Sequence, residues 1–233
     1  AHQLGGITRK VTLMALPEVY LSDMRIVTEL DDQYKHATLK VYTTITNQSS
    51  RPQNQVSLQL SIEGLPTDFH HSVPALAPGE SWSGWVTGQV SSPKKWDCEH
   101  PNLYTLKMAL NEGDQTQEFV SRRFGFREVE VVGNRVLVNG TPVKLHGVCR
   151  HEMHPLMGRV ITPELARRDV ELYREANCNF IRTSHYPPCE ELIEACDELG
   201  MFVELEAPIC WVGHHANENW KRLDYTDPQY YPY

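Results

Sequence analysis

The feature that most limits the fold of this chain is a change in its hydrophobic period near residue 140. From about residue 8 to residue 138, apolar and polar residues alternate with a period of two, which is typical of half-buried strands. Breakers such as Ala77-Pro78-Gly79 separate the runs, and about seven short strands at this spacing predict an antiparallel β-sandwich. The expected strands cover residues 11–14, 39–45, 56–62, 81–86 and 103–110, followed by a hairpin of 129–132 and 135–138 around Gly133-Asn134.

After residue 141, short apolar strands alternate with helical patterns. Thr162-Pro163-Glu164 begins the first helix, because Thr is a good N-cap, Pro suits the first turn, and an acid there favours the helix dipole. This helix ends at Ala176 with Asn177 as its cap, and Gly200 ends the second helix. Alternating strands and helices predict a parallel sheet covered by helices. The expected elements are strands at 143–149, 179–181 and 201–203 and helices at 163–176 and 188–199.

This parallel part is too short to form a complete domain. Three strands and two helices cannot close a barrel, which needs about eight strands, or cover both faces of an open sheet. Residues 207–233 are rich in Trp, His, Tyr and Pro without a regular period, and we interpret them as a long aromatic loop. The chain also begins without Met and in the middle of a strand pattern. We therefore expect an excised piece or processed product, with one whole domain and the opening of another.

The composition is that of a globular chain and argues against several functions. With 40% hydrophobic and 22% charged residues, the chain is not expected to be disordered or fibrous. A net charge of −8 without a basic tract argues against binding of nucleic acid or anionic membranes. The first residues have neither a basic head nor an apolar core, so we expect no signal peptide in this stretch, which leaves cytoplasm and periplasm open. None of the six cysteines forms a Cys-x-x-Cys pair, which argues against a zinc ribbon.

The most specific motif is Asn179-Phe180-Ile181-Arg182-Thr183-Ser184-His185-Tyr186-Pro187, followed by Asp197 and Gly200-Met201-Phe202-Val203. Further blocks in matching order are residues 6–9, 96–104, 125–128, 138–143 and 147–155. Together they resemble glycoside hydrolase family 2, which includes β-galactosidases, β-glucuronidases and β-mannosidases. The stretch His151-Glu152-Met153-His154-Pro155, with Gly158 downstream, is most similar to the β-galactosidase branch.

The resemblance implies an order of modules and an activity. Residues 1–18 would end a jelly-roll sugar-binding domain, 19–125 would form an all-β immunoglobulin-like sandwich, and 126–233 would begin a (β/α)8 TIM barrel. The implied function is part of a retaining β-glycosidase that acts on β-galactosides, with Mg²⁺ or Na⁺ left open as cofactors of the full enzyme. No nucleic-acid or membrane partner is expected, and a homo-oligomer is left open. One departure is Glu204, where the family usually has another apolar residue.

Retaining hydrolysis needs two carboxyl groups about 5–5.5 Å apart. The resemblance implies an acid/base Glu that follows an Asn at the end of an apolar strand, with the nucleophile further on. Within the expected barrel part, residues 126–233, the only Asn-Glu pair is Asn217-Glu218, and no apolar strand precedes it, so Glu218 is a weak candidate. Glu204 and Glu206 would lie roughly 6.6 Å apart on one face of a strand, but both would then approach the sugar from one side. We therefore expect no catalytic carboxylate in this chain.

Other site candidates follow from position, because TIM-barrel sites are built at the carboxyl ends of the strands. These candidates are Arg150, His151, Glu152, Arg182, His185 and Glu206. Arg182 fits either a partner that keeps a site carboxylate ionised or an ion pair that orders the strands. His151 and Glu152 fit sugar binding or a hydrogen-bonded corner at the domain seam. His185 fits a site role or a structural turn, and Glu206 fits a support for the site.

Trp211 and His214 lie in the loop after the third strand. An indole face beside imidazoles suits a pyranose ring, although an aromatic loop that packs on another surface has the same composition. The histidines at 146, 151 and 154 do not have the spacing of a standard zinc helix, so no metal site is expected. Three alternatives stay open: a non-catalytic carbohydrate-binding or interaction module, a complementing fragment, and another family 2 activity such as β-glucuronidase or β-mannosidase.

Overall fold

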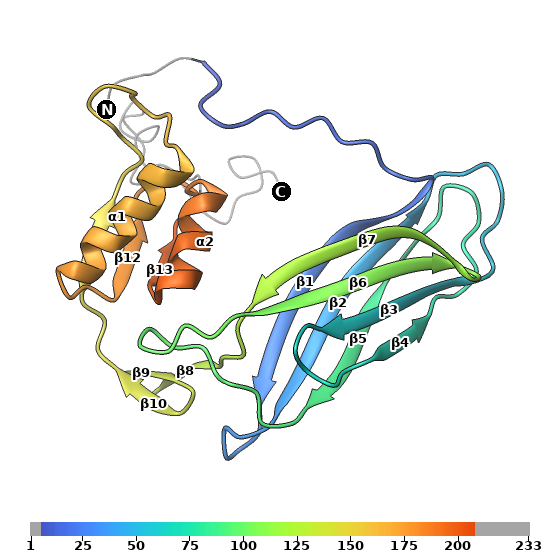
Figure 1. Cartoon of the computed structure of the whole chain (residues 1–233), viewed down its shortest axis with the longest axis horizontal. Helices are drawn as coiled ribbons and strands as arrows, with labels where there is room; N and C mark the ends of the chain where they lie inside the picture. The colour runs from blue at the N-terminus through green and yellow to red at the C-terminus, as the bar shows by residue number, and fades with distance from the viewer. Residues whose placement is uncertain (1–5, 208–233) are drawn as a thin grey trace, which may run out of the picture.

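The computed structural model describes residues 6–207. They form an antiparallel sandwich of two sheets, then a small antiparallel sheet, then a parallel sheet with two helices. Figure 1 shows the sandwich and the helical part as two bodies, with the small sheet between them along the chain. We call the helical part, residues 147–207, the α/β unit. Neither helix of the described residues is long and apolar enough to cross a membrane.

The sandwich strands of the described chain are β1 (Val19–Leu30), β2 (Ala37–Asn47), β3 (Val56–Ile62), β4 (Phe69–Ser72), β5 (Ser81–Val90), β6 (Tyr104–Glu112) and β7 (Gln115–Phe124). They pair antiparallel in the orders β1-β2-β5 and β4-β3-β6-β7. The residues of β2 alternate strictly between buried and half-buried, as its sequence pattern predicts. Leu39 and Ile45 of β2 share one core with Leu58 and Leu60 of β3, and burial of each contributes about 1.5–3 kcal/mol. The predicted sandwich is confirmed.

The predicted strand at residues 11–14 is wrong. Residues 6–18 contain no helix or strand, and Val11, Leu13 and Met14 are 81%, 99% and 71% exposed. An alternating pattern forms a strand only where a neighbouring strand supplies hydrogen bonds, and the described residues offer none to this segment. In Figure 1 the segment runs from beside the α/β unit to the far end of the sandwich, where β1 begins.

A small sheet follows the sandwich, in the order β10-β9-β8. Its strands are β8 (Val129–Val132), β9 (Arg135–Val138) and β10 (Thr141–Val143). The predicted hairpin is confirmed, and Gly133 has the positive φ of 61° that such a turn requires. The single strand expected at 143–149 is wrong, because β10 pairs with β9 while β11 (Gly147–Arg150) pairs with a later strand of another sheet. The chain therefore changes sheets between Val143 and Gly147.

The α/β unit consists of β11, α1 (Pro163–Glu175), β12 (Phe180–Thr183), α2 (Glu190–Leu199) and β13 (Phe202–Leu205). Its strands pair parallel in the order β11-β12-β13. The cap residues act as the sequence predicts: Thr162 Oγ1 accepts a hydrogen bond from the Leu165 amide, and Gly200 ends α2 at φ 77°. Helix α2 begins at Glu190, two residues later than predicted, because Cys189 still has an extended backbone.

Both helices cover the same face of the parallel sheet. Ala166 and Val170 of α1 and Leu192 of α2 pack in one buried cluster with Ile181 of β12. Strands β11 and β12 approach so closely that a Cβ on Gly147 would lie 1.7 Å from the Phe180 carbonyl oxygen. Glycine is therefore required at the start of β11.

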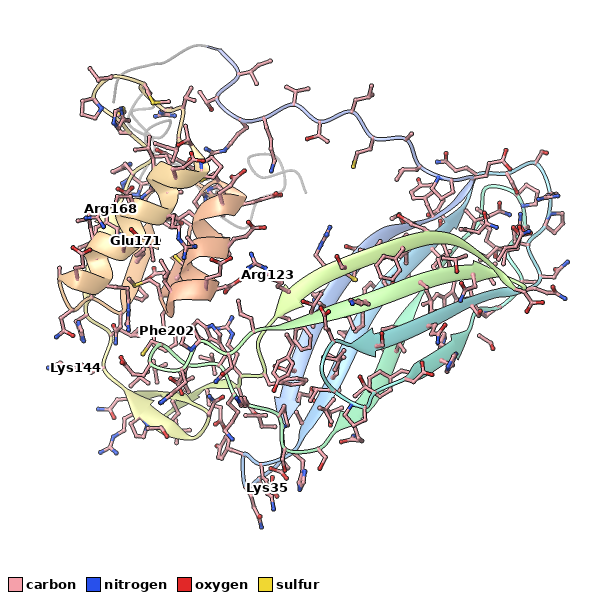
Figure 2. The ribbon with its side chains drawn as sticks, in the orientation of Figure 1. Lys35, Arg123, Lys144, Arg168, Glu171 and Phe202 are labelled. Carbon is pink, nitrogen blue, oxygen red and sulfur yellow. The ribbon has the colours of Figure 1, made fainter. Side chains whose placement is uncertain are left out.

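Trp96, in the loop between β5 and β6, joins the sandwich to the α/β unit. Its ring packs edge-on against Phe202 of β13 at 5.6 Å, and its Nε1 donates a hydrogen bond of 2.8 Å to the Asp197 carbonyl oxygen. Arg123 at the end of β7 forms an ion pair with Glu198 of α2, and Figure 2 shows Arg123 on the side of the sandwich that faces α2. The seam therefore combines an apolar contact with a charged one.

Candidate active site

The carboxyl ends of the three parallel strands bring the predicted site residues together. Because β11, β12 and β13 run in the same direction, the residues that follow them meet at one edge of the sheet. The rings of His151 and His185 lie 5.2 Å apart, centroid to centroid. His185 Nδ1 lies 2.9 Å from Glu206 Oε2, and Arg182 forms an ion pair with the other oxygen of Glu206. Residues from all three strand ends thus form one cluster.

Glu206 is the centre of this cluster. Burial alone raises the pKa of Glu206, but the hydrogen bond with His185 and the positive charge of Arg182 outweigh it and lower the pKa below its usual value. The Glu206 amide also donates to Thr183 Oγ1 at 3.2 Å, which fixes the chain just after β13. Since an ionised carboxylate only accepts hydrogen bonds, Nδ1 of His185 carries the proton. In the neutral ring with this tautomer, the second nitrogen, Nε2, is a hydrogen-bond acceptor.

Arg150 and Glu152, at the end of β11 and just after it, are almost fully buried, at 5% and 2% exposure. Arg150 donates to Asp169 of α1 at 2.8 Å, and Glu152 Oε1 accepts from the Cys189 amide at 2.6 Å. The backbone amide of Glu152 donates to the Tyr186 hydroxyl at 3.1 Å. These contacts fix the strand ends, so neither side chain offers an open face to a ligand.

Glu204 differs from Glu206 although the two are only two residues apart. The Glu204 side chain is 57% exposed, and its Oε1 lies 3.9 Å from Arg182 Nε. Both carboxylates therefore lie beside the same Arg182, on one face of β13, as their spacing predicts. This arrangement gives a charge cluster on one side of the sheet, and it does not place two carboxylates on opposite sides of a bound sugar.

The remaining candidates Trp211, His214 and Glu218 lie outside the described residues. Within 6–207, no group of three or more His, Cys, Asp or Glu side chains is placed to hold a metal ion. Sequence reasoning missed four residues that support the cluster: Arg9, Asp169, Tyr186 and Cys189. Tyr186 is part of the specific motif, but nothing in the local pattern marks Asp169 among the charged residues of α1.

Two family models match the chain in succession. The model described as "Glycosyl hydrolases family 2" matches residues 19–127, and "Glycosyl hydrolases family 2, TIM barrel domain" matches residues 129–230. The chain belongs to glycoside hydrolase family 2. Its described residues accordingly form an immunoglobulin-like sandwich followed by the start of a TIM barrel, as predicted.

Named relatives of this family 2 chain are similar over most of its length. A β-galactosidase of Vibrio vulnificus is 35% identical over 97% of the chain, which covers 22% of that relative. A protein named putative β-glucuronidase from Formosa agariphila is 35% identical over 93% of the chain, which covers 26% of that relative. The chain thus spans about a quarter or less of these proteins.

Solved structures agree with the fold. The β-glucuronidase of Parabacteroides merdae superimposes with a TM-score of 0.72 at 29% identity, over 84% of this chain and 24% of that one. Bacteroides uniformis β-glucuronidase 2, covalently bound to cyclophellitol-6-carboxylate aziridine, gives a TM-score of 0.75 at 28% identity. The match covers 83% of this chain and 25% of that one. The names of the relatives therefore include both galactoside and glucuronide activities.

Proposed function

We propose that this chain is part of a retaining β-glycosidase that hydrolyses terminal β-D-galactosides. The observation that carries the proposal is the cluster of His151, His185, Arg182 and ionised Glu206 at the carboxyl ends of parallel strands, where TIM-barrel enzymes bind their substrates. The β-galactosidase names of several similar relatives support the choice of sugar. The module boundaries after residues 18 and 125, and a homo-oligomer of the whole enzyme, are parts of this proposal.

In this proposal the described residues bind and orient the sugar while two carboxylates outside the chain do the bond chemistry. One carboxyl group protonates the leaving oxygen and the other attacks the anomeric carbon, and water then releases the sugar with its configuration retained. His185 is held in one tautomer by Glu206, so its Nε2 can accept a hydrogen bond from a sugar hydroxyl. Arg182 and His185 keep Glu206 ionised, and Arg150 and Glu152 support the strand ends below.

Trp211 and His214 complete the proposed sugar site. An indole ring suits the apolar face of a pyranose, and a neighbouring imidazole suits its hydroxyls. Glu218 is the weakest candidate for a catalytic group, because no apolar strand precedes it in the sequence.

A β-glucuronidase is the second candidate, favoured by the names of several solved relatives. The two activities differ at C6 of the sugar, where a glucuronide has a carboxylate and a galactoside has a hydroxyl. A glucuronide therefore needs a cation or several hydrogen-bond donors at that position. Arg182 is already engaged by Glu206, so a glucuronide would require a further donor elsewhere in the enzyme.

The test is a panel of p-nitrophenyl β-D-galactoside, β-D-glucuronide and β-D-mannoside, assayed with the natural full-length protein and with these 233 residues alone. We expect the full-length protein to prefer the galactoside and to release the β-anomer first, as NMR would show, and we expect the short chain to be inactive. Glu206→Gln should lower kcat/KM about a hundredfold, because the His185 ring loses its fixed orientation. Glu204→Gln is the matched control and should change kcat/KM less than about threefold, since Glu204 is exposed.

Three results would contradict the proposal. Preference for the glucuronide would favour the second candidate. Full-length protein without glycosidase activity would favour a carbohydrate-binding or interaction module. Turnover by the 233 residues alone, abolished by Glu218→Gln, would place a catalytic group within this chain.

A further inference from the structure

The N-terminal segment, residues 6–18, reaches the α/β unit through two consecutive basic residues. Arg9 forms an ion pair with Glu152 Oε2, and its Nη2 donates to the Pro187 carbonyl oxygen at 3.2 Å. Lys10 Nζ lies 3.1 Å from Glu191 Oε1. A pocket of about 710 Å³ lies between residues 7–10 and the starts of both helices, at Pro163 and Glu190, and the two basic side chains reach the α/β unit beside it.

We infer that Arg9 is a positioning residue of the candidate active site: it neutralises the buried Glu152 and so holds His151 in place beside His185. The inference rests on the proposed function, because it gives Arg9, a residue outside the barrel, a role in shaping the candidate active site.

Glu152 needs a cation because its carboxylate is buried. Its side chain is only 3% exposed, whereas Arg9 remains 40% exposed. Oε1 accepts from the Cys189 amide, and the charge on Oε2 is met by the guanidinium of Arg9. Arg150 lies 3.8 Å from Oε1, and its guanidinium is already hydrogen-bonded to Asp169 at 2.8 Å. Removing one partner of a buried ion pair leaves an uncompensated charge, which forces the other partner to move or to take up a proton.

A shift of Glu152 would reach the site through its neighbours. The backbone amide of Glu152 donates to the Tyr186 hydroxyl at 3.1 Å. His151 precedes Glu152 directly, and its ring lies 6.2 Å from the Tyr186 ring and 5.2 Å from the His185 ring. Small displacements of orienting groups can cost a large part of an enzyme's rate. Arg9 therefore acts on the site through Glu152 and has no contact with the cluster itself among the interactions found in the described residues.

The test compares Arg9→Gln, Arg9→Lys and Lys10→Gln in the natural full-length protein. Lys10 is the matched control, because it is the next residue, carries the same charge, and pairs among residues 6–207 with the partly or fully exposed Glu190 and Glu191. We expect Arg9→Gln to lower kcat/KM about tenfold or more, mainly through kcat, and Lys10→Gln to change it less than about twofold. Arg9→Lys restores the charge and should recover most of the rate. A melting curve of each variant checks that the fold is intact.

A double-mutant cycle with Glu152→Gln separates positioning from a general structural role. Glu152→Gln removes the charge that Arg9 neutralises, so Arg9→Gln should have no further effect on kcat/KM in that background. The inference would be overturned if Arg9→Gln changed kcat/KM as little as Lys10→Gln does. It would also be overturned if Arg9→Gln kept its full effect in the Glu152→Gln background.

Thiol alkylation gives a readout that does not need activity. Cys189 is 4% exposed, and its backbone amide donates a hydrogen bond to Glu152. Burial, together with a hydrogen bond between the thiol and Glu152, raises the pKa of the Cys189 thiol to about 11. Alkylation of Cys189 in the native protein is therefore slow. Arg9→Gln should accelerate iodoacetamide labelling of Cys189 about tenfold as Glu152 moves, and Lys10→Gln should not. If the protein hydrolyses no glycoside, the proposed function fails. The labelling rate still tests the role of the Arg9–Glu152 ion pair by itself, because an unchanged rate in Arg9→Gln would refute that role.

Discussion

The sandwich and the α/β unit bury their strands to different extents. In β2 and β3 every second side chain lies in one core between two sheets, and Leu58 is fully buried. The parallel sheet has helices on one face only. The cluster around Trp96 covers the start of the other face at Phe180 and Phe202, and toward the carboxyl ends that face leaves Arg182 and Glu204 38% and 57% exposed. A sheet of parallel strands is usually covered on both faces. The sandwich is therefore self-sufficient among the described residues, whereas the α/β unit is not.

The difference shows how one chain combines support and chemistry. The sandwich uses its alternating residues mainly for packing, and its few buried polar side chains, such as Thr43 and Asn47, hydrogen-bond to the backbone. The α/β unit places polar side chains at the strand ends and on the face that has no helices, where they are accessible to a ligand. The face that leaves these polar side chains accessible also buries less apolar surface, which reduces the stability of the α/β unit.

The largest expected effect is on hydrogen exchange of the 233-residue chain. Amides of residues 20–120 should be protected by the global stability of the sandwich, whereas those of 141–206 should open locally. We expect a difference of about a thousandfold in protection between β2 and β12, equivalent to about 4 kcal/mol. Mass spectrometry of the labelled, digested protein measures both regions in one experiment. Equal protection of residues 20–120 and 141–206 would mean that the two regions unfold together. The α/β unit would then be stable without a second layer on its sheet.

A second test uses two leucines with the same burial. Leu58 and Leu192 are both fully buried, Leu58 in the sandwich core and Leu192 on the face of α2 that packs against the parallel sheet. Leu58→Ala should destabilise the sandwich by about 3 kcal/mol through the cavity that it leaves. Leu192→Ala should lower the stability of the α/β unit and leave the sandwich transition unchanged, as differential scanning calorimetry can show. A fall of the sandwich transition in both variants would show one cooperative unit.

The same comparison explains what the sequence predicts well. The alternation in β2 and β3 and the caps Thr162 and Gly200 are local patterns with local physical causes, and the structure confirms them. The meeting of His151, His185 and Glu206 follows from strand direction alone, so it could also be predicted.

The misses have a common physical reason. Strand β7 pairs with β6 along most of its length, with one register shift at Leu110/Asn111, but its polar sequence with two arginines conceals the period. Residues 11–14 have a strand pattern and form none, because pairing depends on a partner. The tie between Arg9 and Glu152 joins residues far apart in sequence, and no local period encodes which charges meet. Long-range pairing of charges therefore had to come from the structure.

The smallest expected effect is at the charged seam between the two regions. Glu198 of α2 accepts from Arg123 of the sandwich and from Arg167 of α1, and these hydrogen bonds lower the pKa of Glu198 below its usual value. A lowered pKa means that the ionised form is favoured in the folded protein. The stabilisation is thus present above the unfolded-state pKa of Glu198 and is lost as the pH falls through the lowered value.

Glu198→Gln tests this seam. It should cost less than about 1 kcal/mol at neutral pH, because the pair is partly exposed, and the cost should shrink as the pH falls below the usual range of a glutamate. The matched control is Glu171→Gln, which also contacts Arg167 but lies within α1 and does not cross the seam. Urea unfolding of the α/β unit between pH 7 and pH 3 measures both variants. If the cost of Glu198→Gln is independent of pH, or if Glu171→Gln has the same cost, the charge of Glu198 does not hold the two regions together. The apolar contact of Trp96 with Phe202 is then the main link between the sandwich and the α/β unit.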